Sequence, residues 1–333
     1  MAQKKIDVII PAYHAHSTLP RTLASIAMQN NADELTVYVC NDAGGDNYTE
    51  ICDSFRAFID IDELTLPING GCGVARQFGI DRSHAPYFIC QDADDTFGSA
   101  FALGNLLRAM ESDKNNVVIA GVFVEETYEG KFVSHQNDTI FMHAKLYKRS
   151  FIDKYGIRFN ETRANEDYGF NTLCRLVASQ DEKIVSTQDV THFWHYKHDS
   201  ITREKDHDYI HNKAVIGMID NMTWAIKRAQ AIAPKKEKVT DYWAVKTLAE
   251  IYCYYLHVLT FAPQYGAQSL ERAKRYYAEV YADVATRVKR EAENRVWQDV
   301  IETRAGMLKE LSAPVPFTIY EFINQIKPEE VKA

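Results

Sequence analysis

Three carboxylates crowd one short turn of the sequence. Asp92, Asp94 and Asp95 follow directly after residues 87–91, a largely apolar segment that predicts a β-strand. Neighbouring carboxylates repel one another and raise each other's pKa unless a cation lies between them. Oxygen ligands of this kind suit Mg²⁺ or Mn²⁺, although Asp is also common in solvated turns. The pattern indicates either a divalent-cation site or an ordinary turn.

Two other polar groups have spacings that suit chemistry. Gly70, Gly71 and Gly73 precede Arg76, which suits a tight strand-to-helix turn with close backbone approach to a nucleotide. The alternative interpretation of Arg76 is an ordinary surface cation that binds no nucleotide. Glu166 and Asp167 stand before an apolar run, where acids project from a helix start or simply cap it.

The elements that must position these groups follow an α/β pattern in the first 125 residues. Short apolar runs alternate with amphipathic segments, which predicts parallel strands joined by helical crossovers. Ligands of open α/β sheets bind beyond the carboxyl ends of the strands. The expected strands cover residues 6–10, 35–40, 63–66, 87–91 and 117–123, and the expected helices residues 18–28, 48–58, 72–81 and 101–111.

The later part of the chain is predicted to be helical. Residues 242–259 and 270–296 are rich in Ala, Tyr, Lys, Arg and Glu, with Pro234 and Pro263 between longer runs. We therefore expect a catalytic domain over residues 1–205 and an α-helical domain over residues 206–333. The basic runs around residues 235–238 and 272–275 are read as solvated helix faces or, alternatively, as contacts to an anionic partner.

Composition limits the class of protein. The chain has 333 residues, a formal net charge of −8 and 46% hydrophobic residues, which suits two globular units. No stretch reaches the roughly 20 apolar residues of a transmembrane helix, and the first residues do not resemble a signal peptide. The six cysteines form no CxxC pair. These features predict a cytoplasmic protein in a reducing compartment.

Five segments, taken in order, resemble the family-2 glycosyltransferases of GT-A fold. Asn41 and Gln77 depart from the family's usual Asp and Asn. The resemblance covers roughly residues 5–205 and implies a nucleotide-sugar-dependent enzyme. The sequence of the helical part does not resemble a family that we recognise. The five segments are residues 8–13 (VIIPAY), 39–46 (VCNDAGGD), 69–80 (NGGCGVARQFGI), 92–94 (DAD) and 165–168 (NEDY).

The resemblance implies a uracil-nucleotide site on the first half of the sheet. Asp42 would accept a hydrogen bond from the base edge, since a carboxylate suits the uracil N3–H donor. An Asx turn at Asn41 and Asp42 is the alternative. Lys197 and Arg203 would close over the diphosphate, although an exposed loop would read the same way. The other nucleotide-sugar contacts implied are Pro11, Ala12, Tyr13, Gly71, Arg76, Asp92 and Asp95.

The resemblance also implies an inverting, metal-dependent transfer. Asp94 would bind Mn²⁺ or Mg²⁺, and His195 would be a further ligand that favours Mn²⁺. His192 competes for that role, and a structural histidine is the alternative. Asp167 would be the general base, with Glu166 beside it, and attack in line with the leaving diphosphate would invert the anomeric carbon.

The acceptor is the open part of the prediction. A saccharide or polysaccharide precursor is expected, with a protein side chain or a hydroxymethylated DNA base as alternatives, and the acidic composition opposes nucleic acid. The sequence has no P-loop and no GxGxxG after its first strand, which argues against kinases and dehydrogenases. A nucleotidyltransferase and a non-catalytic nucleotide-sugar-binding module are the competing classes.

Overall fold

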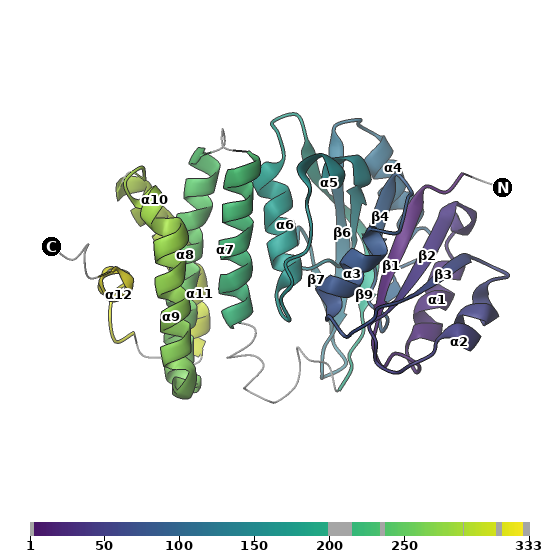
Figure 1. Ribbon diagram of the computed structural model, residues 1–333, viewed down its shortest axis with the longest axis horizontal. Helices are drawn as coiled ribbons and strands as arrows, with labels where there is room; N and C mark the ends of the chain where they lie inside the picture. Colours follow the sequence, from purple (N-terminus) through teal and green to yellow (C-terminus); the bar gives the residue numbers. More distant parts are fainter. Residues whose placement is uncertain (1–2, 199–214, 234–236, 289, 311–314, 329–333) are drawn as a thin grey trace. The chain divides into compact units, whose positions relative to one another are not determined.

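A computed structural model describes residues 3–198, 215–233, 237–288, 290–310 and 315–328 (Figure 1). The chain divides into two compact units. The first contains residues 1–163 and 178–200, and the second contains residues 164–177 and 201–333. The predicted boundary near residue 205 lies outside the described residues, and the units differ from the prediction in placing residues 164–177 with the helical part.

The first unit is built on a nine-stranded sheet with the order β3-β2-β1-β4-β8-β6-β9-β5, and β7 pairs with β6. Strands β1 to β4 pair in parallel, as do β6 and β9, whereas β8, β7 and β5 pair antiparallel to their neighbours. The predicted α/β fold with a mostly parallel sheet is confirmed. The strands are β1 (Ile6–Ala12), β2 (Leu35–Asn41), β3 (Asp60–Thr65), β4 (Tyr87–Cys90), β5 (Thr96–Phe97), β6 (Asn116–Glu126), β7 (Phe132–His135), β8 (Lys145–Lys148) and β9 (Lys183–Trp194).

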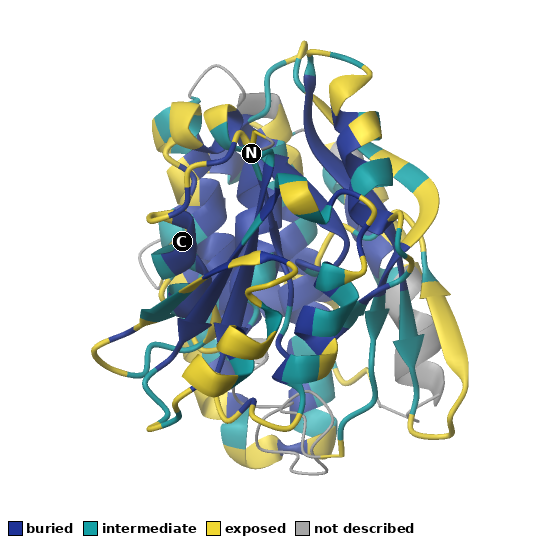
Figure 2. Cartoon of the chain, turned by 90° about the vertical axis from the view of Figure 1, so that its right-hand side faces the viewer, coloured by how far each residue is buried: buried dark blue, intermediate teal, exposed yellow. Residues whose placement is uncertain are grey.

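Strand β1 occupies the middle of the parallel part, between β2 and β4, and all seven of its residues are buried. Such continuous apolar runs are expected where helices cover both faces of a sheet. Figure 2 shows these central strands in the dark blue of buried residues. The helices of this unit are α1 (Leu19–Ala27), α2 (Thr49–Phe55), α3 (Cys72–Ile80), α4 (Ala102–Glu111) and α5 (Arg149–Tyr155).

A buried ion pair ties α5 to the sheet. Asp7 on β1 is 1% exposed, and its Oδ2 lies 3.0 Å from Arg149 Nη2 and accepts a hydrogen bond from the Ala85 N–H. Burial raises the pKa of Asp7, while the Ala85 N–H and Arg149 act in the opposite direction. Because a buried charge without a partner is costly, Arg149 fixes where α5 begins.

The second unit is helical. Its longest helix, α8, covers the predicted residues 242–259, whereas the helix predicted over residues 270–296 is divided into several elements. Four neighbouring side chains are buried here: Tyr276, Tyr277, Val280 and Tyr281. One face of a regular α-helix would not bring all four toward the core, and a π-helical segment from Tyr277 to Tyr281 accommodates them. The helices are α6 (Glu166–Val177), α7 (Val215–Ile232), α8 (Glu237–Phe261), α9 (Gly266–Tyr276), α10 (Ala282–Ala285), α11 (Arg290–Glu310) and α12 (Ile319–Ile326).

Helix α6 packs with the helices that follow it. Ten of its twelve residues are buried. The Tyr168 hydroxyl donates to Glu250 Oε2 of α8 at 3.1 Å, and Asn221 Nδ2 of α7 donates to the Ala164 carbonyl at 2.9 Å. These contacts explain why α6 belongs to the second unit. No helix in the described part of the chain is long and apolar enough to cross a lipid bilayer.

Candidate functional site

The candidate site lies at the carboxyl ends of β1, β2 and β4, where Tyr13, Asp42 and Asp92 follow adjacent strands. Pro11 and Ala12 are buried at the end of β1, but Tyr13 is 51% exposed. The Tyr13 ring lies against Gly44, since a Cβ at residue 44 would come within 2.9 Å of Tyr13 Cδ2. The structure therefore brings together the segments that the sequence predicted for a nucleotide.

Asp42 holds the glycine loop that leads into α3. Its Oδ1 accepts from the Gly70 N–H at 2.7 Å, and its Oδ2 accepts from the Gly71 N–H at 2.8 Å and from Asn69 Nδ2 at 3.1 Å. Gly71 has φ of 87°, a conformation that favours glycine. A contact between Asp42 and a base edge stays a prediction, to which the structure adds this second role.

Arg76 on α3 points to the carboxylate turn. Arg76 is 5% exposed, and its Nη2 donates to Asp92 Oδ1 at 2.7 Å. Burial alone would raise the pKa of Asp92, but Arg76, with His143 and His192 nearby, outweighs it and lowers that pKa to about 2. Asp92 is therefore ionised and already has a buried guanidinium at hydrogen-bonding distance.

Asp94 has weaker compensation. Its Oδ2 lies 3.6 Å from Lys197 Nζ, and its main-chain carbonyl accepts from Arg21 Nη2 at 2.6 Å. Burial and the nearby Asp92 raise the pKa of Asp94, although Lys197 acts in the opposite direction. A carboxylate in this setting is suited to a divalent cation. Lys197 thus lies beside the predicted metal ligand, whereas Arg203 lies outside the described residues.

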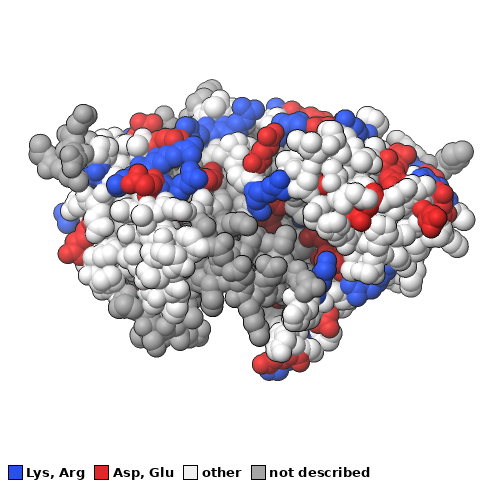
Figure 3. Space-filling view, turned by 60° about the horizontal axis from the view of Figure 1, so that its bottom comes forward, with Lys and Arg blue, Asp and Glu red and all other residues white. Residues whose placement is uncertain are grey.

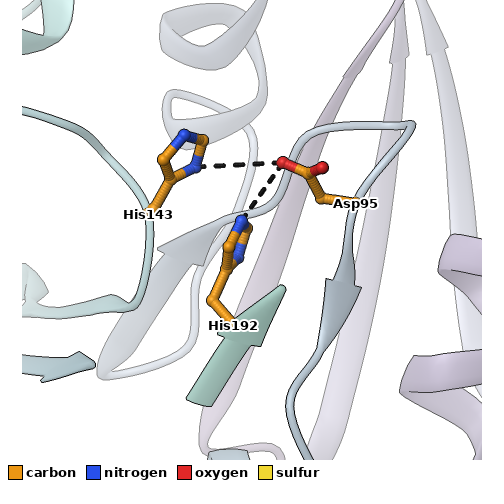
Figure 4. A group of neighbouring side chains, drawn as sticks. All are labelled: Asp95, His143 and His192. Atoms are coloured by element: carbon orange, nitrogen blue, oxygen red, sulfur yellow. Dashed lines mark hydrogen bonds and ion pairs between the residues drawn. The ribbon is translucent and has the colours of Figure 1, made fainter. Parts of the chain in front are cut away.

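Asp95 joins two histidines in a buried cluster (Figure 4). Its Oδ2 lies 3.1 Å from His192 Nε2 and 4.0 Å from His143 Nδ1. Burial raises the pKa of Asp95 to about 6 even though His192 lowers it. In turn, His192 Nδ1 lies 3.2 Å from Gln91 Oε1. One potential metal ligand from each of these three residues lies within 4.8 Å of the others.

His195, the histidine predicted as a metal ligand, makes different contacts. Its Nε2 lies 2.8 Å from Thr96 Oγ1 and its Nδ1 lies 3.6 Å from Glu126 Oε2. Its main-chain N–H donates to Asp95 Oδ1 at 2.9 Å. Burial and Arg21 lower the pKa of His195, whereas Glu126 acts in the opposite direction. Its ligation of a metal stays a prediction.

An irregularity between β6 and β9 aims His192 into the cluster. The register shifts between Ala120 and Phe123, and Thr191 and His192 are both 0% exposed although strand residues normally alternate between faces. Gly121 lies at this bulge, and a Cβ there would collide with Thr191 Oγ1. Sequence reasoning missed His143 because no motif links it to Asp95, 48 positions earlier.

Glu166 and Asp167 occupy the first turn of α6, as predicted, but in the second unit. Glu166 is 8% exposed, and Asp167 Oδ1 accepts a hydrogen bond from the Tyr168 N–H at 2.8 Å. The helix is preceded by Asn165 with φ of 59°. The structure bears out the helix start on which the prediction rested, and a role as general base stays a prediction.

The basic residues of α9 are balanced by acids. Arg275 Nε donates to Glu279 Oε1 at 2.7 Å, and Lys274 Nζ donates to Glu271 Oε1 at 2.7 Å. Figure 3 shows Lys and Arg atoms interleaved with Asp and Glu atoms on this helical part. The interleaving favours a solvated helix face over an anion-binding surface. Lys235 and Lys236 lie outside the described residues.

Two solved structures share the fold. The TarS 1–349 fragment of S. aureus in complex with UDP-GlcNAc has a TM-score of 0.68 at 16% identity, with 94% of each chain covered. The mannosyltransferase PcManGT of Pyrobaculum calidifontis, in complex with GDP-Man and Mn²⁺, has a TM-score of 0.51 at 12% identity, covering 98% of this chain and 86% of that one. At such identities the likeness concerns the fold alone.

Curated relatives give sequence evidence. Glycosyltransferase GlyA of Streptococcus pneumoniae is 22% identical over 63% of this chain and 33% of its own length. The succinoglycan biosynthesis protein ExoU of Rhizobium meliloti is 28% identical over 50% of this chain and 56% of its own length. The chain thus spans about a third to just over half the length of these relatives. The model of glycosyl transferase family 2 matches residues 7–176, more than half of the chain, and the chain therefore belongs to that family.

Proposed function

We propose that this chain is an inverting, metal-dependent glycosyltransferase that moves a sugar from a UDP-sugar to a hydroxyl group. The observation that carries the proposal is the carboxylate turn after β4. There Asp92 is already paired with buried Arg76, whereas Asp94 has Lys197 at 3.6 Å and a raised pKa. A carboxylate such as Asp94, at the carboxyl edge of a family-2 sheet and 3.6 Å from its lysine, suits a cation and the diphosphate that it accompanies.

Uracil is the base that we propose. UDP-GlcNAc is the ligand named for TarS, which has a higher TM-score than PcManGT with its GDP-Man. The half-exposed Tyr13 and the end of β2 would form the base and ribose pocket, with Pro11 and Ala12 supporting it from the end of β1. Gly71, whose loop is held by Asp42, would allow the nucleotide to approach the main chain.

Mn²⁺ or Mg²⁺ is the proposed cofactor, with Asp94 as its ligand and His195 as a candidate second one. Asp94 fits such an ion because burial and the neighbouring Asp92 disfavour the charge of its carboxylate. When bound, the ion would act as a Lewis acid that stabilises the leaving diphosphate. Lys197, which faces Asp94 in this structure, would contribute a positive charge to the same phosphates.

Asp167 is the proposed general base. Its carboxylate would take the acceptor's hydroxyl proton while the acceptor oxygen forms a bond to the anomeric carbon. The bond from that carbon to the phosphate oxygen breaks, and its electron pair leaves with the nucleoside diphosphate. Attack from the face opposite the leaving group inverts the anomeric configuration. Glu166, nearly buried beside Asp167, would position it.

A saccharide or polysaccharide precursor is the proposed acceptor class. The name of ExoU places that relative in succinoglycan biosynthesis. A DNA base is disfavoured because the basic residues around Arg275 are paired with acids. A cytoplasmic location remains the sequence prediction.

The decisive experiment separates donor binding from transfer. We expect Asp167→Asn to retain UDP-sugar affinity by calorimetry and to lose about 10²- to 10⁴-fold in turnover, because an amide cannot accept the proton. Glu166→Gln is the matched control and should lose less. Donor hydrolysis serves as the readout until an acceptor is found. If wild-type protein bound UDP-sugar but neither hydrolysed nor transferred it, a non-catalytic binding module would be the better description.

A further inference from the structure

A buried cluster brings together side chains from three separate segments of the chain: Asp95, His143 and His192 (Figure 4). Asp95 lies in the turn between β4 and β5, His143 lies in the segment before β8, and His192 lies on β9. Their exposed fractions are 1%, 8% and 0%. Side chains that titrate or bind metals are seldom sealed from water without a partner of matching chemistry.

The spacing of the three side chains is close to that of metal ligands. Imidazole nitrogen and carboxylate oxygen bind an ion such as Zn²⁺ at about 2.0–2.2 Å, which keeps adjacent ligand atoms roughly 3 to 3.5 Å apart. The 3.1 Å between Asp95 Oδ2 and His192 Nε2 meets this requirement. The 4.0 Å between Asp95 Oδ2 and His143 Nδ1 is too long for a hydrogen bond and needs only a small shift for ligation.

His192 has a polar neighbour at each ring nitrogen. Its Nδ1 lies 3.2 Å from Gln91 Oε1, and its Nε2 lies 3.1 Å from Asp95 Oδ2. In the tautomer in which Nδ1 donates to Gln91, the Nε2 lone pair faces Asp95 and is available to a metal ion. Metal-binding histidines are commonly held by such a bond from their other ring nitrogen.

The two oxygens of the Asp95 carboxylate have different neighbours. Oδ1 accepts the His195 main-chain N–H at 2.9 Å, whereas Oδ2 faces the two imidazoles. Around the cluster, Phe141 stacks on His143 and Phe123 packs edge-on, which excludes water.

We propose that Asp95, His143 and His192 bind a second divalent transition-metal ion, distinct from the ion proposed at Asp94. Two imidazoles and one carboxylate favour Zn²⁺ or Co²⁺ over Mg²⁺, which prefers oxygen ligands and water. The ion ties β9 and the segment before β8 to the carboxylate turn. This site does not depend on the proposed sugar transfer, because it needs neither nucleotide nor acceptor.

The test measures metal retention without any nucleotide. Full-length protein is depleted with a chelator, incubated with Zn²⁺ or Co²⁺ and desalted, and its metal content is then measured by mass spectrometry. We expect about one retained equivalent, with a visible Co²⁺ absorption that reports nitrogen and oxygen ligands. His143→Phe keeps an aromatic ring in the stack but removes a ligand, and His192→Gln removes another, so both should lose this ion.

Two matched variants make the assignment specific. His135→Phe replaces another histidine of the same aromatic cluster, whose ring stacks on Phe123 at 4.3 Å, and should retain the ion. Asp94→Asn should also retain it while losing Mn²⁺-dependent UDP binding. The proposal is overturned if wild-type protein retains no Zn²⁺ or Co²⁺, or if Asp94→Asn abolishes retention as His143→Phe does. The first result would leave UDP binding with Mn²⁺ at Asp94 intact, so the two proposals fail separately.

Discussion

The turns after β2 and β4 flank the same central strand, and both carry aspartates at the carboxyl edge of the sheet, but they supply those aspartates with different partners. Asp42 accepts from two main-chain N–H groups and one side-chain amide. Asp94 has Lys197 at 3.6 Å and a raised pKa. The groups that surround each aspartate therefore decide whether its carboxylate stabilises the fold or remains available to a ligand.

The largest expected effect concerns the turn after β4. Asp94→Ala should weaken Mn²⁺-dependent UDP binding by at least about 100-fold, because a lost ligand leaves the diphosphate charge uncompensated. Calorimetry of UDP with and without Mn²⁺ measures this change. Unchanged affinity would place the ion elsewhere and remove the contrast between the two turns.

The turn after β2 should respond through stability instead. Asp42→Ala leaves the N–H groups of Gly70 and Gly71 and the Asn69 amide without their acceptor, so we expect the free energy of unfolding to fall by about 2 to 4 kcal/mol. Urea unfolding monitored by circular dichroism gives this number.

A base contact of Asp42 would add a binding effect to the same variant. UDP should bind better than GDP or ADP to the wild type, and Asp42→Ala should erase that preference. A stable Asp42→Ala protein with unaltered UDP preference would show that the carboxylate neither holds the loop nor reads the base.

A smaller effect of opposite sign is expected for Asp94→Asn in metal-free buffer. Removing one of three crowded charges relieves repulsion, so the melting temperature should rise by about 1 to 3 °C. Differential scanning fluorimetry is sufficient, with Asp42→Asn as the control that should melt lower than wild type. A fall for both variants would mean that Asp94, too, supports the fold.

Lys197→Met should have the smallest effect. A half-exposed ion pair contributes less than about 1 kcal/mol, so thermal stability should hardly change. UDP affinity should drop a few-fold, and its dependence on salt should weaken, because one positive charge near the phosphates is lost. Affinity that falls as far as in Asp94→Ala would indicate that Lys197 takes over the role of the cation.

The sequence predicted the parallel part of the sheet well because buried strands leave continuous apolar runs. The strand predicted at residues 35–40 corresponds to Leu35–Asn41, and the helix predicted at residues 72–81 corresponds to Cys72–Ile80. Strands β5, β7, β8 and β9 were not predicted. The first three have only two to four residues, which give no periodicity, and most residues of β9 are exposed or half-buried. The predicted motif residues Asp42, Arg76 and Asp92 do meet at one edge.

The rest of the site depends on distant contacts that have no local pattern. His143 reaches Asp95 only because β8 lies between β4 and β6 in the sheet, and no spacing rule anticipates that pairing. Likewise, the placement of α6 follows from contacts such as Tyr168 with Glu250, 82 positions away. A motif identifies the residue type that a reaction needs, whereas the partners of that residue come from the topology.

Substitutions at Gly121 should be poorly tolerated in this sheet. This glycine carries no chemistry, yet even one methyl group there would collide with Thr191, the neighbour of His192. In a library of all single substitutions, position 121 should therefore be depleted about as strongly as the aspartates of the turn after β4. Substitutions in the exposed loops should therefore be tolerated far more readily than substitutions at this buried position between β6 and β9.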